Sequence, residues 1–158
     1  MTDPLEEIGG RVDPQEIIEL LDLTPLPGEG GMWSQVLLDD HSSAIYYLLA
    51  GDDFSAMHRL PHPETYHHYA GSPLELLVLG SGGSIDRPVL GSDLSAGQRP
   101  AVVVPGDAWQ GSWCRGPWCL VGTTMAPPFS FDTLEIAGRD ELQAQYPAAV
   151  ETIIALTR

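Results

Sequence analysis

Most of the residues that could do chemistry in this 158-residue chain lie in one stretch, residues 51–71. It holds four of the five histidines, which are His58, His62, His67 and His68. One carboxylate, Glu64, lies among the histidines and tyrosines of its second half. Histidine exchanges a proton near neutral pH, because its ordinary pKa is about 6.5, and it also binds metals. We therefore expect any active site of the chain to be centred here.

The spacing of these residues predicts which side chains share a site. Along a β-strand, side chains two positions apart point to the same face. Glu64, Tyr66 and His68 therefore share one face of a predicted strand. His58 is expected on the neighbouring strand, and Gln110 on a strand pair further along the chain. The hypothesis is that a closed β-container directs His58 and Glu64 toward one cavity.

One chemistry that these residues allow needs no metal. His58 would be the general base, and Tyr66 or His68 the general acid. Glu64 would orient the imidazole of His58 and stabilise its cation. Proton transfer of this kind, beside a carbonyl group, suits the isomerisation or epimerisation of a sugar derivative. The catalytic set is therefore His58, Glu64, Tyr66 and His68.

The alternative chemistry uses a divalent metal held by His58, Glu64 and Gln110. Imidazole and carboxylate ligands suit Fe, Mn, Ni or Zn. The Gln110 carbonyl would be a weaker, neutral ligand than a histidine. The residues leave both cofactor states open, with a divalent metal or with none, and they also allow a binding module without catalysis.

Four residues are assigned to contacts with a small polar ligand, which are Arg59, Trp109, Gln110 and Glu29. The planar guanidinium of Arg59 could hold a carboxylate or a phosphate. Its alternative is an ion pair with a surface acid. Trp109 could equally belong to the core, and Glu29 could be a simple turn residue beside Gly30 and Gly31.

Composition excludes several kinds of partner. The net charge is −15, from 22 acidic and 7 basic side chains. Binding to nucleic acid or to an anionic membrane surface needs clustered Lys and Arg. The sequence has no run of about 18 apolar residues and no apolar leader. We therefore expect a cytoplasmic protein, in which Cys114 and Cys119 are reduced thiols, with a local disulfide as the alternative.

Turn signals divide the chain into short elements. A helix is predicted near 14–22, with Asp13 as its N-cap and Pro14 at its first position. A second helix is predicted at about 147–156. Between them, short strands alternate with Gly, Pro and Asp turns, and no βαβ alternation is visible.

This arrangement predicts a single domain over 13–158, after a loose leader at 1–12. Strands separated by turns from about 31 to 137 indicate an all-β fold. An antiparallel barrel or a double-sheet sandwich would satisfy this pattern.

The stretch 51–71 resembles the first signature of the cupin superfamily. That signature contains two histidines, one residue apart, then a glutamate and a glycine. His58, Glu64 and Gly71 match the first histidine, the glutamate and the glycine. Leu60 stands at the second histidine position, which departs from the pattern.

The second cupin signature also has a counterpart in this chain. Gly97, Pro105 and Gly106 resemble its glycine and its Pro-x-Gly turn. Its closing histidine falls on Gln110. Two of the three usual histidine ligands are therefore absent from the matched positions.

Further segments resemble the fifth cupin subfamily, a group of small cupins long described only as a domain of unknown function. They lie in order at 27–31, 44–49, 55–60, 64–71, 90–94, 104–110 and 126–132. The resemblance implies a double-stranded β-helix, the cupin jelly roll, with short flanking helices and a homodimeric assembly. It implies an architecture similar to the nucleotide-sugar 3,5-epimerases, which work without metal, or alternatively a metal-dependent dioxygenase or lyase.

Overall fold

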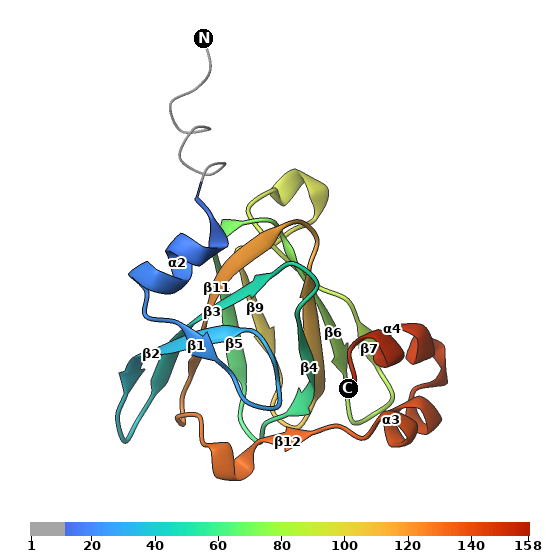
Figure 1. Cartoon of the computed structure of the whole chain (residues 1–158). Coiled ribbons are helices and arrows are strands. Elements are labelled where there is room, and N and C mark those ends of the chain that lie inside the picture. The colour runs from blue at the N-terminus through green and yellow to red at the C-terminus, as the bar shows by residue number, and fades with distance from the viewer. Residues whose placement is uncertain (1–11) are drawn as a thin grey trace.

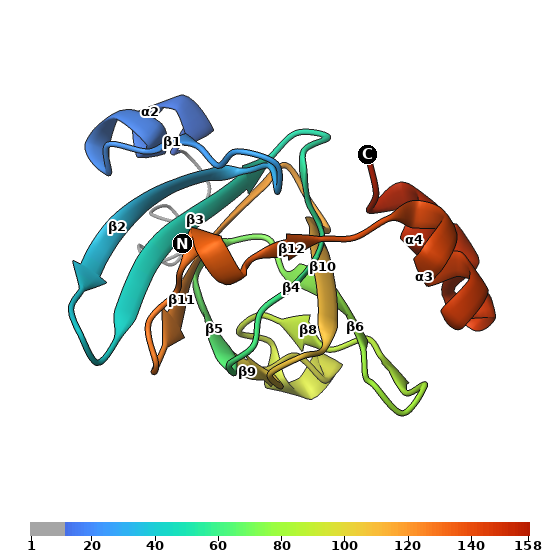
Figure 2. The same ribbon diagram turned by 90° about the horizontal axis from the view of Figure 1, so that it is seen from below.

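Two antiparallel sheets that face each other form the body of the molecule, which is a computed structural model describing residues 12–158 (Figures 1 and 2). Sheet A contains, in spatial order, β1 (Thr24–Pro25), β2 (Met32–Leu38), β3 (Ser43–Ala50), β11 (Trp118–Met125), β5 (Glu64–Gly71) and β9 (Ala101–Val104). Sheet B contains β12 (Glu135–Ile136), β4 (Phe54–Arg59), β10 (Trp109–Cys114), β6 (Leu74–Leu79) and β7 (Ile85–Asp86), and β8 (Val89–Leu90) also pairs with β6. The predicted all-β jelly roll is confirmed.

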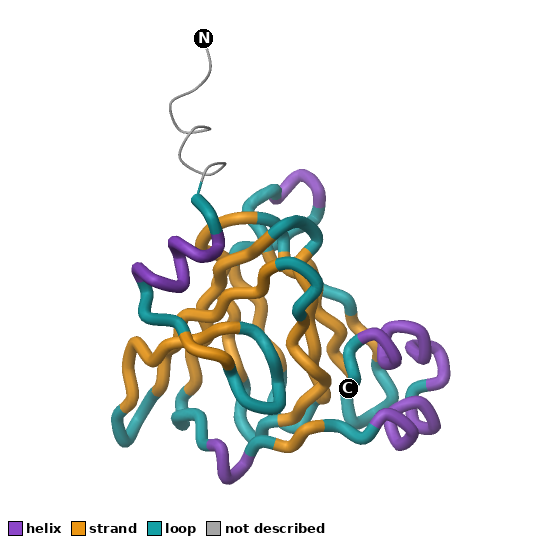
Figure 3. The backbone as a smooth tube through the Cα atoms, in the orientation of Figure 1, coloured by secondary structure: helices purple, strands orange, loops and turns teal. Residues whose placement is uncertain are grey.

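Within residues 12–158, the helices lie at the periphery of the strands (Figure 3). They are α2 (Pro14–Leu20), α3 (Arg139–Gln145), α4 (Val150–Ala155) and the 3-10 turns Leu94–Ala96, Phe131–Thr133 and Pro147–Ala149. The predicted N-cap is confirmed, because the Asp13 carboxylate accepts a hydrogen bond from the backbone N–H of Gln15 at 3.0 Å. The predicted leader lies outside the described residues, except for Val12.

Strand β6 shows how the layers are built. Leu74, Leu76 and Val78 point into the space between the sheets, where they join the main core. Leu77 and Leu79 point outward and pack against the C-terminal helices. Because both faces of β6 are covered, the strand is apolar at nearly every position instead of alternating.

The helices cover the outer faces of the two sheets. Helices α3 and α4 lie against sheet B, on the side away from sheet A (Figure 2). Helix α2 covers part of sheet A, where Ile17 and Leu23 pack on Leu48. Within residues 12–158, no helix is both long and apolar enough to cross a bilayer. Cys114 and Cys119 are free thiols, in agreement with the prediction.

Strand pairing decides which side chains face the interior together. In sheet B, His58 of β4 lies directly opposite Gln110 of β10. In sheet A, Tyr66 of β5 lies opposite Thr123 of β11. These pairs face each other across the space between the sheets.

The packing of α4 on sheet B can be tested with two adjacent isoleucines. Ile153 is fully buried in the outer core of sheet B, whereas Ile154 is 46% exposed. We expect Ile153→Ala to lower the free energy of unfolding by about 2–5 kcal/mol, because it leaves a cavity. The control Ile154→Ala should lower it by less than about 1 kcal/mol. Equal losses in urea unfolding would contradict the arrangement of α4.

Candidate functional site

A cavity lies between the inner faces of the two sheets. Its polar lining consists of Glu29, Ser43, Tyr47, His58, Glu64, Tyr66 and Thr123. Its apolar lining consists of Leu26, Trp33, Ile45, Leu60, Met125, Phe129 and Phe131. The centre of a water-sized sphere can move through about 30 Å³ of it. By this measure one water needs about 10–15 Å³, so the cavity has room for about two waters unless its lining moves.

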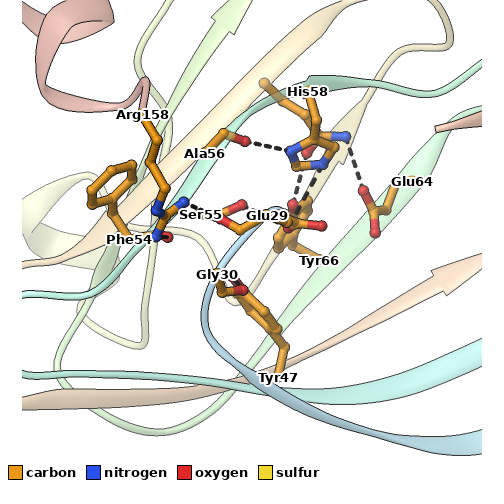
Figure 4. A network of polar contacts seen from close by, with 11 residues as sticks. Glu29, Gly30, Tyr47, Phe54, Ser55, Ala56, His58, Glu64, Tyr66 and Arg158 are labelled. Carbon is orange, nitrogen blue, oxygen red and sulfur yellow. Dashed lines mark hydrogen bonds and ion pairs between the residues drawn. The ribbon is translucent and has the colours of Figure 1, made fainter. Parts of the chain in front are cut away.

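The orientation of His58 is fixed by the backbone of its own strand. Its side chain is 2% exposed, and Nδ1 lies 2.7 Å from the carbonyl oxygen of Ala56. A carbonyl oxygen only accepts, so the proton of the neutral imidazole must be on Nδ1. The Nε2 atom therefore carries the lone pair, and it lies 3.8 Å from Oε1 of Glu29 (Figure 4). His58 is thus arranged to accept a proton at Nε2.

Glu29 reaches the cavity from the loop between β1 and β2. Its Oε1 accepts a hydrogen bond from the Ser55 hydroxyl at 2.7 Å. Its backbone carbonyl accepts from the N–H of Ala56 at 2.7 Å and from Nη1 of Arg158 at 2.6 Å. The same guanidinium binds Asp53 and stacks on Phe54, which Figure 4 shows beside the loop. The carboxylate of Glu29 is therefore anchored by contacts at both its side chain and its backbone.

Two glycines allow this loop to pass close to the sheet. Gly30 and Gly31 have φ angles of +96° and +76°, which other residues rarely adopt. A Cβ on Gly31 would lie 2.5 Å from the Tyr47 ring. The hydroxyl of Tyr47 in turn donates to the carbonyl of Gly30 at 2.7 Å. The backbone conformation and the close packing on Tyr47 therefore explain the two glycines beside Glu29 without any ligand.

A chain of hydrogen bonds holds the second carboxylate. The Tyr66 hydroxyl donates to Oε1 of Gln110 at 2.7 Å, and Nε2 of Gln110 donates to Glu64 at 2.9 Å. Burial raises the pKa of Glu64; charged His58 opposes this rise and the nearby Glu29 adds to it. Burial also raises the pKa of Tyr66 well above its usual range, and the charges of Glu64 and Glu29 add to the effect. Tyr66 therefore remains a hydroxyl donor.

The expected metal ligands do not form a ready metal site. The Gln110 carbonyl oxygen already accepts the Tyr66 hydroxyl, and its amide nitrogen faces Glu64. Across residues 12–158, no three His, Cys, Asp or Glu side chains are grouped as metal ligands. In this arrangement the donor set His58, Glu64 and Gln110 does not fit a bound metal.

The structure brings together five of the predicted site residues, namely Glu29, His58, Glu64, Tyr66 and Gln110. Arg59 and Trp109 lie elsewhere, which corrects their expected place at the ligand. Nε of Arg59 donates to Glu135 at 2.6 Å, and its guanidinium lies 4.4 Å from the centroid of the Trp109 ring, outside the cavity. The alternative of a surface ion pair describes Arg59 correctly.

His68 is also absent from the cavity lining. Its Nε2 lies 3.2 Å from the carbonyl oxygen of Ser72, near the far end of β5. The alternation of the strand placed His68 on the correct face, but too far along the strand to reach His58. The expectation that His68 supplies the acid therefore lacks a geometric basis.

Sequence reasoning missed several residues of the site. Ser55 binds Glu29 although it lies three positions from His58, out of phase with a two-residue repeat. The cause is a bulge in the pairing of β4 with β10, between the pairs Gln110–His58 and Ser112–Ser55. Phe129 and Phe131 belong to a segment that the cupin resemblance singled out, but no pattern assigned them to the cavity.

The pH dependence of stability tests the burial of Glu64. Because its pKa is raised on folding, the folded protein holds this proton more tightly than the unfolded chain does. That stabilisation is present below the ordinary value of 4.5 and is lost as pH rises through the raised pKa. We expect the stability of Glu64→Gln, relative to the unmodified protein, to increase as pH rises above about 4.5.

The matched control is Glu135→Gln, at an exposed carboxylate whose pKa is lowered by its hydrogen bond with Arg59. Its relative stability should change with pH in the opposite direction, or not measurably. Urea titrations at several pH values measure both differences. The same trend in the two variants would contradict the assignment.

Comparison with known proteins agrees with this fold. Residues 15–137 match the family described as Cupin superfamily (DUF985). A structure from Shewanella oneidensis superposes with a TM-score of 0.88 at 29% identity, covering 93% of this chain and 98% of that one. A hypothetical protein from Leishmania major gives a TM-score of 0.84 at 26% identity, covering 92% and 99%.

A more distant structure shares the fold alone. It is a cupin-2 domain from Rhodospirillum rubrum, with a TM-score of 0.63 at 13% identity, covering 85% of this chain and 88% of that one. No protein of curated function matches the chain. Because the family match spans most of the described residues and the fold agrees, the resemblance seen in the motifs is confirmed. The chain belongs to the cupin superfamily, in the family of DUF985 domains.

Proposed function

We propose that this cupin binds a small polar molecule in the cavity and moves a proton on it without a metal. The reaction would be the isomerisation or epimerisation of a sugar derivative. One observation carries the proposal, which is the orientation of His58. Of the two nitrogens in the His58 ring, Nε2 is the one that is free to accept a proton. It faces the cavity beside the carboxylate of Glu29.

The base would act on a carbon beside a carbonyl group. Neutral His58 takes the proton at Nε2, and the electron pair of the broken C–H bond forms an enolate. The hydrogen bond from Nδ1 to Ala56 keeps the ring aligned during the transfer. Glu29, 3.8 Å away, stabilises the imidazolium that results. Glu29 therefore takes the role that the sequence suggested for Glu64, which is to stabilise the cation of His58.

The acid would be Tyr66. Burial raises the pKa of Tyr66 well above its usual range, so its hydroxyl stays protonated. It can return a proton to the enolate from a second direction, as an epimerisation requires. Before the reaction this hydroxyl holds Gln110, whose amide in turn donates to the Glu64 carboxylate. Tyr66 lines the same cavity as His58.

A test of the proposal follows carbon-bound hydrogen. In D₂O, aldoses and ketoses with and without an amino group should exchange the proton beside their carbonyl when the protein is present. We expect His58→Gln to slow this exchange by about 100-fold or more, since a general base contributes about 10²–10⁴. NMR spectra recorded over time give the rate.

The matched control is His41→Gln, at an exposed histidine in the turn between β2 and β3, outside the cavity lining. It should leave the exchange rate unchanged. Dialysis against a chelator should also leave the rate unchanged. Exchange that survives His58→Gln, or that disappears with the chelator, would contradict the metal-free mechanism.

Homodimerisation remains a separate prediction, and sedimentation at the 17.1 kDa of one chain would contradict it.

A further inference from the structure

We infer that the ligand of this cavity carries a positive charge, as a small ammonium compound such as an amino sugar, and not a phosphate or diphosphate group. This inference rests on the proposed binding function and names the class of molecule that the site accepts. Three features of the lining carry it, and they concern its charges, its spare hydrogen-bond acceptor sites and its aromatic rim.

The charges of the lining are unbalanced. Two carboxylates, Glu29 and Glu64, face the cavity, and both are less than 10% exposed. Among the lining residues that the structure describes, none is Lys or Arg. Arg59, the one cation of β4, is turned outward to Glu135, and Arg158 binds the backbone carbonyl of Glu29 and the side chain of Asp53. A buried carboxylate is expensive without a partner of opposite charge, and His58 can provide one such charge for two acids.

The polar atoms of the lining retain capacity for a ligand. Each carboxylate has about four acceptor sites. Glu29 uses one for Ser55, and Glu64 accepts from Gln110 and interacts with Thr123. In addition, His58 is 98% buried, and its Nε2 has no hydrogen bond within the described residues. An ammonium group supplies donors alone, which is what this set of acceptors lacks.

The rim of the cavity is aromatic. Phe131 lies edge-on to both Phe129 and Trp33, with ring centroids 4.9 Å and 6.0 Å apart. The face of an aromatic ring attracts a cation, and most strongly when water is excluded. A phosphate group would gain nothing from these rings and would meet the two carboxylates. The net charge of −15 also draws cations toward the protein and repels anions.

The same features distinguish this cavity from a site for nucleotide sugars. A diphosphate needs Arg or Lys, or clustered backbone N–H groups, within hydrogen-bond reach. In the described lining, the imidazole of His58 is the one side chain that could bind a diphosphate as a cation. The likeness to nucleotide-sugar epimerases that the motifs imply therefore does not extend to the charge of the ligand.

Direct binding of three matched sugars tests the inference. Glucosamine, glucose and glucose 6-phosphate share one ring and differ in charge. Isothermal titration or ligand-observed NMR should show glucosamine binding at least tenfold more tightly than glucose, and glucose 6-phosphate more weakly than either. Glu29→Gln and Glu64→Gln should each reduce the preference for glucosamine to less than threefold. Glu135→Gln, at a carboxylate outside the cavity, should leave it unchanged.

The outcomes separate this inference from the proposed reaction. Equal or tighter binding of glucose or of its phosphate would overturn the inference, and so would no binding of any of the three. Proton exchange that depends on His58, without a preference for the ammonium compound, would uphold the reaction and refute the ligand class. A preference for glucosamine without any exchange would uphold the ligand class and refute the reaction.

Discussion

The rest of this structure depends on one constraint, which is that two carboxylates and an imidazole are buried in a cavity whose other lining side chains carry no charge. A charge removed from water is destabilising unless hydrogen bonds or an opposite charge replace the water. The fold supplies fixed neighbours for each group. His58 is held by the carbonyl of Ala56, Glu29 by Ser55, and Glu64 by Gln110. The bond of Glu29 joins a loop to β4, and the bond of Glu64 joins β5 to β10, so the site and the packing of the sheets are one arrangement.

The anchoring of Glu29 shows how far that arrangement extends. Arg158 binds the backbone of the Glu29 loop and also the side chain of Asp53, which accepts the N–H of Gly31. The family match ends at residue 137, so this guanidinium lies outside the matched span. The carboxylate that faces His58 is therefore positioned partly by a segment that follows the cupin barrel in sequence. That segment reaches the loop because α3 and α4 pack on the outside of sheet B.

Much of the fold could be predicted from the sequence, because turn residues and β-branched runs are local signals. The observed strands at 74–79, 101–104 and 118–125 all lie within the span of about 31 to 137 where the turn signals predicted short strands. The site was predictable where it obeys the two-residue repeat, as Glu64 and Tyr66 do. It was not predictable at Ser55, because a bulge shifts the phase of β4 and no residue within β4 itself indicates that bulge. The outward turn of Arg59 depends on Glu135, which is 76 residues away in the chain.

The small size of the cavity explains why charge can decide what it binds. With room for about two waters, the lining leaves little solvent to screen its carboxylates. Two unit charges 4 Å apart interact by about 1 kcal/mol in bulk water, but by about 4 kcal/mol at the effective dielectric constant of about 20 found near protein groups. A ligand must displace part of the lining to enter, and this displacement weakens every ligand to a similar degree. The electrostatic term, in contrast, differs in sign between a cation and an anion, and so it is the term by which this cavity can select.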